Sequence, residues 1–297
     1  MSSTVVTTAE PISWLNAVRT QAVPILDRGL AYGDGLFETM RYERGTVPLL
    51  PWHLRRLLAD AERLYIPLSE AQVITQLNTV LHELQNTASI TNTGALKLIV
   101  TRGEGGQGYA PPASPQPNCM WIYRPIGDQP EPAQAGVTLC VSPVRLSRSK
   151  LLGGIKHLNR LEHVLASQAA KRLPEQRSLL PEQHSLLLDE TDAVIETLVH
   201  NIFWLHQGAL YTPELTHSGV AGVMRQWIIE QAEARGQNVR IERFSLPDVL
   251  AADEVFICNS LRGVWPVVQI EQPHTKSHTN ATLFKPGPIT RQIQKAV

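Results

Sequence analysis

One lysine lies where its surroundings could make it a nucleophile. Lys156 is part of GGIKHLNRLEHVL, residues 153–165, where two glycines and an isoleucine precede it and an amphipathic segment follows. A lysine held among apolar residues has a lowered pKa, and its neutral amine attacks carbonyl groups. The competing interpretation is an exposed lysine at the start of a helix, which is the common case. Taken alone, the pattern leaves both interpretations open.

A carboxylate and a glycine before a helix are the next candidate groups. Glu196 lies in DAVIETLVHNIFWL, residues 192–205, between apolar residues typical of a strand, and a carboxylate there needs a partner. That partner could be a protonated ring nitrogen of a ligand or a local backbone N–H. Gly222, in GVAGVMRQW, marks a change from loop to helix, and the free N–H groups of a helix start can bind phosphate. Many helices begin after glycine without binding anything.

The segment RGEGGQG, residues 102–108, has the spacing G-x-G-x-x-G after a strand-like run. In a dinucleotide-binding fold this spacing opens a helix, but here the sequence YAPP follows and cannot do so. A nicotinamide-dependent oxidoreductase would depend on this spacing alone. We interpret the segment as a loop that presents Arg102 and Tyr109 to a ligand, with a plain surface hairpin as the alternative.

Composition argues against several classes of protein. The 297 residues carry 27 basic and 27 acidic side chains, so no overall charge favours nucleic acid or an anionic membrane as a partner. No run approaches the roughly 20 apolar residues of a membrane-spanning helix, and residues 1–20 lack a secretory signal pattern. Cys119, Cys140 and Cys258 are far apart, which suits a reducing compartment, and no histidine has metal-ligand spacing. We expect a cytoplasmic protein without a metal.

Mixed helices and strands must position these groups. Apolar periodicity predicts helices, of which the clearest is the first, at residues 51–65, 69–85, 157–173 and 222–235. Short runs of branched and aromatic residues predict strands at residues 95–101, 119–123, 137–142, 185–188, 193–197, 202–205 and 254–258. The two kinds of element do not alternate strictly, which favours an α+β fold.

A proline-containing stretch predicts where the chain divides. Residues 124–136 have almost no large apolar side chains, so we expect a linker there between an N-terminal α+β domain, 1–123, and a C-terminal domain, 137–297. The C-terminal domain would carry Lys156. A second polar stretch, 171–184, is interpreted as a surface excursion.

The order of the motifs along the chain resembles that of the fold-type IV pyridoxal-phosphate enzymes. This family includes branched-chain and D-amino-acid aminotransferases and aminodeoxychorismate lyases. The similarity extends over nearly the whole chain, through the motifs DRGLAYGDGLFETMR (27–41), HLRRL (53–57), LKLIVTRGEGGQGY (96–109), GIKHLNRLE (154–162), VIETLVHNIFW (194–204), GVAGVMR (219–225) and DEVFICNS (253–260). It implies a two-domain, D-amino-acid aminotransferase-like architecture with the active site between the domains, and a homodimer.

The resemblance also implies roles for individual residues. Lys156 would form the Schiff base with pyridoxal 5'-phosphate, and Glu196 would face the pyridine nitrogen. The cofactor phosphate would be bound by a further set of residues, namely Arg56, the backbone of Val223 and Met224, and Asn259 and Ser260. A basic side chain, helix N–H groups and a hydroxyl also suit a dianion on physical grounds.

Within the family, KHLNRLE and RGEGGQGY are most similar to aminodeoxychorismate lyases. This similarity implies conversion of 4-amino-4-deoxychorismate to 4-aminobenzoate, a folate precursor, and pyruvate, with Lys156 moving the proton. Thr39 could assist that transfer or could simply be a strand residue, and Arg160 could lie close to the cofactor ring. The candidates for binding the substrate carboxylates are Arg28, Arg102 and Tyr109. An aminotransferase and a non-catalytic pyridoxal-phosphate-binding protein remain as alternatives.

Overall fold

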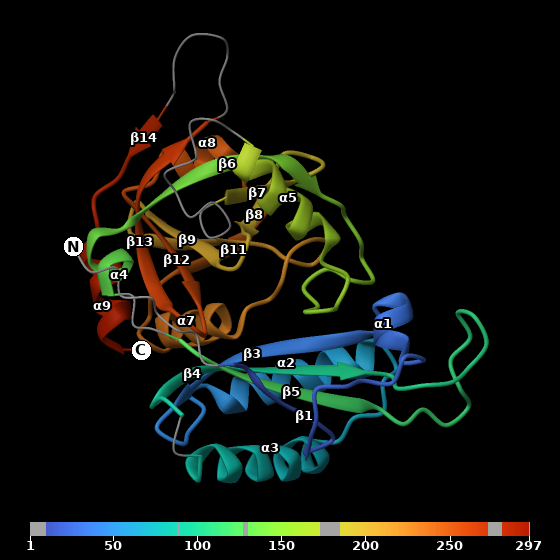
Figure 1. Cartoon of the computed structure of the whole chain (residues 1–297). Coiled ribbons are helices and arrows are strands. Elements are labelled where there is room, and N and C mark those ends of the chain that lie inside the picture. Colours follow the sequence, from blue (N-terminus) through green and yellow to red (C-terminus); the bar gives the residue numbers. More distant parts are fainter. Residues whose placement is uncertain (1–9, 88–89, 127–129, 173–184, 273–280, 297) are drawn as a thin grey trace. The chain divides into compact units, whose positions relative to one another are not determined.

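The computed structural model describes residues 10–87, 90–126, 130–172, 185–272 and 281–296. The chain divides into two units (Figure 1). Unit 1 contains residues 1–128 and 156–159, and unit 2 contains residues 129–155 and 160–297. The excursion expected at 171–184 falls largely outside the described residues.

Unit 1 is an antiparallel five-stranded sheet with helices. Its elements are β1 (Ile12–Leu15), β2 (Val18–Arg19), α1 (Arg28–Tyr32), β3 (Gly35–Glu43), α2 (Leu50–Arg63), α3 (Glu70–Gln85), β4 (Thr93–Thr101) and β5 (Asn118–Pro125). The strand order is β2-β1-β5-β4-β3, which puts β3 at an edge. Apolar side chains of α2 and α3 meet the same face of the sheet, at Met40, Leu98 and Trp121.

Local sequence explains both long helices of this unit. Helix α2 has proline in its first turn, and it buries Leu54, Leu57 and Ala61, which lie three and four residues apart. Helix α3 begins at a capping box between Ser69 and Gln72. The helices predicted at 51–65 and 69–85 are therefore confirmed to within two residues.

Unit 2 is built on a large mixed sheet. Its helices are α4 (Pro130–Ala135), α5 (Leu161–Arg172), α7 (Val223–Ala234), α8 (Leu246–Leu250) and α9 (Pro288–Ala296). Its strands are β6 (Val137–Leu146), β7 (Ser185–Asp189), β8 (Val194–Thr197), β9 (Asn201–His206), β10 (Ala209–Pro213), β11 (Val239–Glu242), β12 (Glu254–Asn259), β13 (Gly263–Glu271) and β14 (Ala281–Leu283).

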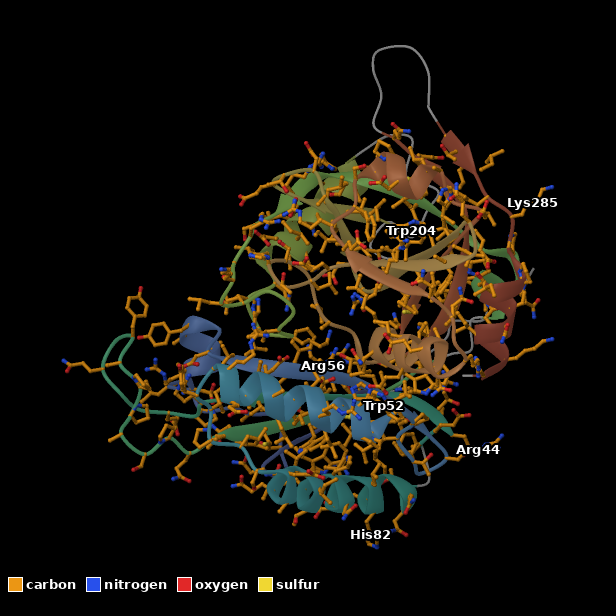
Figure 2. All side chains as sticks on the ribbon, turned by 180° about the vertical axis from the view of Figure 1, so that it is seen from behind. Arg44, Trp52, Arg56, His82, Trp204 and Lys285 are labelled. Atoms are coloured by element: carbon orange, nitrogen blue, oxygen red, sulfur yellow. The ribbon has the colours of Figure 1, made fainter. Side chains whose placement is uncertain are left out.

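The sheet of unit 2 closes on itself. Its order is β11-β10-β9-β12-β13-β6-β7-β8, and β8 pairs again with β9. The ring that results encloses a cluster of apolar side chains, among them Trp204, Ile257 and Trp265. Trp204 is labelled in Figure 2. The closing pair is Glu196 opposite Asn201, so the fold itself sets the position of the candidate carboxylate.

Two expectations about the chain's organisation need correction. The helix predicted at 157–173 begins only at Leu161, because residues 156–158 instead pair with the edge of β3. This pairing places Lys156 with unit 1, although we expected it in the C-terminal domain. The predicted linker, 124–136, also contains the end of β5 and helix α4.

Candidate active site

The peptide group of Lys156 is held on both sides. Its N–H donates to Asp60 Oδ2 at 3.1 Å, and its C=O accepts the N–H of Phe37 at 3.0 Å. The side-chain Nζ lies 4.3 Å from the centre of the Phe37 ring, within the range of a cation–π contact. Because the backbone is fixed by strand pairing and by a carboxylate, the amine extends from a rigid base. A merely exposed helix-start lysine, the competing interpretation, does not describe this arrangement.

The two glycines before Lys156 allow a close backbone approach within unit 2. Gly154 has a φ of +78°, a conformation that side chains rarely adopt. A Cβ on Gly153 would lie 2.4 Å from the carbonyl oxygen of Thr216. The N–H of Gly154 donates to Gly219, and its carbonyl accepts from Ala221. The GG pair thus fastens the segment before the lysine to the loop that leads into α7.

Arg56, the predicted phosphate ligand, lies on α2 (Figure 2) in a buried ionic cluster. Its Nε donates to Glu38 Oε1 at 2.8 Å, and its Nη2 donates to Glu38 Oε2. His53 Nδ1 lies 2.7 Å from Glu38 Oε2. Burial alone would raise the pKa of Glu38, but the Arg56 charge and the His53 hydrogen bond lower it to about 2. Glu38 therefore stays ionised and fixes the plane of the Arg56 guanidinium.

A second lysine, which sequence patterns did not single out, contacts the same aromatic ring as Lys156. Lys97 Nζ lies 5.0 Å from the centre of the Phe37 ring. Burial, together with the Arg124 charge, lowers the pKa of Lys97. Thr39 pairs directly opposite Lys97 between β3 and β4, and alternation puts Thr39 on the same face of β3 as Phe37. In the sequence, Lys97 could have been noticed only as a charged residue inside the apolar run ALKLIVT.

Arg28 and Arg102, two of the residues predicted to bind the substrate, have extensive contacts within the protein. Both are buried and both donate to Asp34, from Arg28 Nε at 2.9 Å and from Arg102 Nε at 2.8 Å. Arg102 also donates to the carbonyls of Leu64 and Tyr65, and Arg28 donates to carbonyls of the 105–110 loop. These guanidinium groups therefore bond to the protein itself, and that of Arg28 holds the 105–110 loop in place. Tyr109 is 88% exposed, and its ring packs against Tyr32 at 5.5 Å.

Glu196, in unit 2, is a buried carboxylate that accepts three hydrogen bonds. Its Oε2 accepts from the backbone N–H of Val220 at 3.0 Å and from Asn201 Nδ2 at 3.3 Å. Its Oε1 lies 3.1 Å from His163 Nε2. An ionised carboxylate has about four acceptor sites. Among the residues that the structure describes, three are used, so one site on Oε1 remains for a further donor.

The start of α7 has the features of an anion-binding site. The N-cap Gly222 provides no side-chain hydrogen bond, so the first N–H groups, including those of Val223 and Met224, have no cap from that residue. A Cβ on Gly222 would lie 2.0 Å from Asn201 Oδ1, so only glycine fits beside the partner of Glu196. Buried Arg225 follows and donates to Thr212 and Pro213, and burial lowers its pKa to about 10. Arg225 therefore ties the first turn of α7 to the end of β10.

The other predicted cofactor residues have local hydrogen bonds. Asn259 Oδ1 accepts from the N–H groups of Leu261 and Arg262, and its Nδ2 donates to Val199, so this side chain shapes the turn that carries Ser260. Arg160 Nη2 donates to the carbonyl of Ile155. These contacts do not test the predicted roles of Asn259, Ser260 and Arg160 in cofactor binding.

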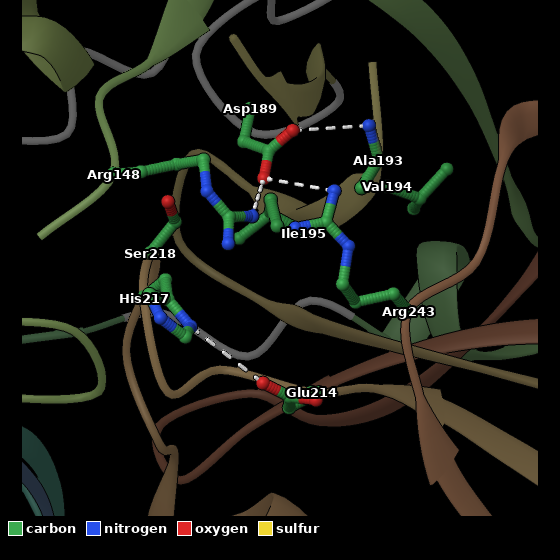
Figure 3. A pocket seen from close by; sticks show the side chains of 9 residues that line it. All are labelled: Arg148, Asp189, Ala193, Val194, Ile195, Glu214, His217, Ser218 and Arg243. Atoms are coloured by element: carbon green, nitrogen blue, oxygen red, sulfur yellow. Dashed lines mark hydrogen bonds and ion pairs between the residues drawn. The ribbon is translucent and has the colours of Figure 1, made fainter. Parts of the chain in front are cut away.

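A second polar cluster supports the loops of unit 2 (Figure 3). Arg148 and Arg243 reach Asp189 from different segments, with Arg148 Nη1 at 2.6 Å from Oδ2. Burial alone would raise the pKa of Asp189, but hydrogen bonds from Thr191 and Arg148 lower it. Because Ser149 and Ser147 also bond to residues of the 217–218 loop, this cluster anchors the segment that leads to Lys156.

The described part of the chain has neither a cluster of metal-ligating side chains nor a helix suited to a membrane. No group of three or more His, Cys, Asp or Glu side chains in that part of the chain could hold a metal ion. Among the described helices, none is both long enough and apolar enough to cross a membrane. Cys119, Cys140 and Cys258 are buried free thiols.

Comparison with known proteins identifies the family. The sequence model of amino-transferase class IV matches residues 35–270, and the chain belongs to this family. Aminodeoxychorismate lyase of Vibrio harveyi is 34% identical over 286 residues, which cover 95% of this chain and 97% of the relative. The crystal structure of 4-amino-4-deoxychorismate lyase from Pseudomonas aeruginosa has a TM-score of 0.82 at 38% identity, covering 96% of this chain and 97% of that one.

More distant members share the fold. The branched-chain amino acid aminotransferase of Escherichia coli has a TM-score of 0.75 at 22% identity, covering 96% of this chain and 92% of that one. The predicted α+β, fold-type IV architecture is confirmed.

The chemistry of the donor set fits pyridoxal 5'-phosphate, the predicted cofactor. The ligand needs an amine for its aldehyde, N–H donors for its phosphate and an acceptor for its ring N–H. Lys156 offers the amine, and the glycine-led start of α7 offers the donors. Glu196 offers the one acceptor site that its three protein donors leave open.

Proposed function

We propose that this chain is an aminodeoxychorismate lyase, which converts 4-amino-4-deoxychorismate to 4-aminobenzoate and pyruvate. The observation that carries this proposal is the near-complete match to two lyases, at 34% and 38% identity. The reaction releases both products from one substrate, so it needs no second substrate.

Several of the predicted residues would hold the cofactor. Lys156 would hold the aldehyde carbon, and Glu196 would accept the ring N–H. Arg56 and the N–H groups of Val223 and Met224 would bind the phosphate. Asn259 shapes the turn from which the hydroxyl of Ser260 reaches the phosphate. Arg160 supports the segment between Lys156 and α5 through its bond to Ile155.

Pyridoxal 5'-phosphate, when bound, supplies an aldehyde for the substrate amine and a ring that accepts an electron pair. The Nζ of Lys156 takes the proton from the substrate carbon that bears the amine nitrogen. Glu196 keeps the ring nitrogen protonated, which favours electron withdrawal. The carbon–oxygen bond at the neighbouring carbon then breaks and makes the substrate ring aromatic. The enolpyruvyl group leaves as enolpyruvate, which takes up a proton to become pyruvate.

Residues around Phe37 would support this proton transfer. Lys97 places a second amine against the ring that Lys156 contacts, and burial together with the Arg124 charge lowers the pKa of Lys97. We propose that Thr39, opposite Lys97 on the same face of the sheet, orients the transferred proton or the substrate. The surface around Phe37 thus carries two amines and a hydroxyl.

A coupled assay tests the function. Aminodeoxychorismate is supplied, and pyruvate is followed with lactate dehydrogenase. Wild-type protein should release pyruvate and 4-aminobenzoate in equal amounts, whereas Lys156→Ala should lose nearly all activity and the visible absorbance band of the bound cofactor. Lys150→Ala, a change at an exposed lysine of the same region, is the control. Transfer of the amino group from alanine to 2-oxoglutarate, without pyruvate from aminodeoxychorismate, would instead identify an aminotransferase.

We also propose that the protein acts as a cytoplasmic homodimer that supplies a folate precursor. Support for association comes from large apolar side chains that unit 1 leaves exposed, including Ile25 at 82%, Leu26 at 71% and Leu30 at 65%. Exposed Tyr109 continues this surface through its contact with Tyr32. Sedimentation equilibrium should give twice the 32.9 kDa chain mass. A fully active monomer would contradict the dimer.

A further inference from the structure

Glu196 is anchored differently at its two oxygens. Oε2 accepts the N–H of Val220 and the amide of Asn201, and Asn201 Nδ2 also donates to the carbonyl of Val220 at 2.9 Å. Asn201 is the strand partner of Glu196 as well. This oxygen is therefore held by the sheet and by the loop before α7. No backbone group of the described residues donates to Oε1.

Among the described residues, His163 is the one donor to Oε1. It lies on α5, and its side chain is 15% exposed while that of Glu196 is 5% exposed. An ionised carboxylate only accepts hydrogen bonds, so Nε2 of His163 must carry the hydrogen in the 3.1 Å contact. A carboxylate fixed at one oxygen can pivot about it, whereas contacts at both oxygens fix its plane. His163 supplies the second contact.

We infer that His163 is a positioning residue that orients the open acceptor site of Glu196 toward the pyridine N–H of the cofactor. The inference rests on the proposed cofactor role of Glu196. It predicts that His163 affects cofactor binding through the ring nitrogen alone, since its contact with the site passes through Oε1. A residue that only stabilised α5 would affect every cofactor analogue equally.

The test compares two ligands on cofactor-free protein. Dissociation constants are measured by absorbance and fluorescence titration for pyridoxal 5'-phosphate and for its 1-deaza analogue, in which carbon replaces the ring nitrogen. His163→Ala should weaken binding of pyridoxal 5'-phosphate by about tenfold, the scale of one hydrogen bond to a charged group. It should leave binding of the deaza analogue unchanged. His163→Gln, which can keep an N–H near Oε1, should retain most of the wild-type affinity.

Two results would overturn the inference. Equal weakening of both ligands would show a purely structural role, and unchanged affinity for both would show no role. If His163→Ala does not fold, the same two dissociation constants are measured for His163→Met, which keeps the side-chain volume but has no hydrogen-bond donor. The pyruvate assay on the wild type tests the lyase function separately. If the protein binds pyridoxal 5'-phosphate but releases no pyruvate, the lyase proposal is wrong. The comparison of the two ligands at His163 does not depend on that result.

Discussion

Asp60 Oδ2 accepts the peptide N–H of Lys156 at 3.1 Å. Asp60 is buried, and burial raises its pKa although the Lys156 N–H opposes that shift. On α2 it follows His53 and Arg56 at spacings of seven and four residues, which puts all three on one face of the helix. One helix face thus holds both the cluster around Glu38 and the backbone of the candidate catalytic lysine.

Asp60→Ala should destabilise the protein and loosen Lys156. The change leaves a backbone N–H without its acceptor, which costs about 1–3 kcal/mol of unfolding free energy. Urea denaturation measures this loss, and the pyruvate assay should show slower turnover. Asp60→Asn keeps a carbonyl oxygen at the same reach and is the matched control. Equal stability of the Ala and Asn variants would contradict the role of this contact.

Stability should fall in acid because of Glu38. Its pKa is about 2 in the folded protein, against an ordinary value of 4.5. A carboxyl group with a lowered folded-state pKa stabilises the protein above its unfolded pKa, and this contribution disappears as the pH falls from 4.5 toward 2. A shift of this size corresponds to about 3 kcal/mol. Unfolding free energies at about pH 6 and about pH 3 should therefore differ less in Glu38→Gln than in the wild type.

Substitutions at Arg102 and Tyr109 should show which of these residues contributes to stability and which to substrate binding. Arg102→Lys cannot replace the paired bonds to Asp34 and the two backbone carbonyls, so the variant should lose about 3 kcal/mol of stability. Tyr109→Ala, at an exposed position, should change stability by less than about 0.5 kcal/mol. Thermal melting and KM are measured for both. An Arg102→Lys variant with normal melting and a raised KM would instead support the substrate-binding role.

The sequence predicted those parts of the site that local patterns encode. Apolar periodicity predicted α2, and flanking glycines and apolar residues identified Lys156 and Glu196 as candidates. The contacts that position them were not predictable in the same way. Asp60 meets Lys156 across 96 residues of chain, and His163 meets Glu196 across 33. The helix expected at 157–173 started late because the edge of β3 offers hydrogen bonds that no local pattern contains.

Glu196→Gln should keep the cofactor but slow the reaction. Three N–H donors surround the carboxylate, from Val220, Asn201 and His163, so the amide nitrogen of Gln must face at least one of them. A neutral amide also holds the ring proton less well than a carboxylate does. We expect turnover to fall on the order of 100-fold, as when one preorganised electrostatic contact is removed.

Cofactor absorbance and the pyruvate assay, measured on the same sample, separate binding from turnover in this variant. Glu190→Gln, at an exposed glutamate on the turn after β7, removes the same charge outside the site and is the control. It should match the wild type in both measurements. If Glu196→Gln turned over at the wild-type rate with the cofactor bound, the carboxylate would not be the group that keeps the ring nitrogen protonated, because the amide that replaces it has no charge to do so.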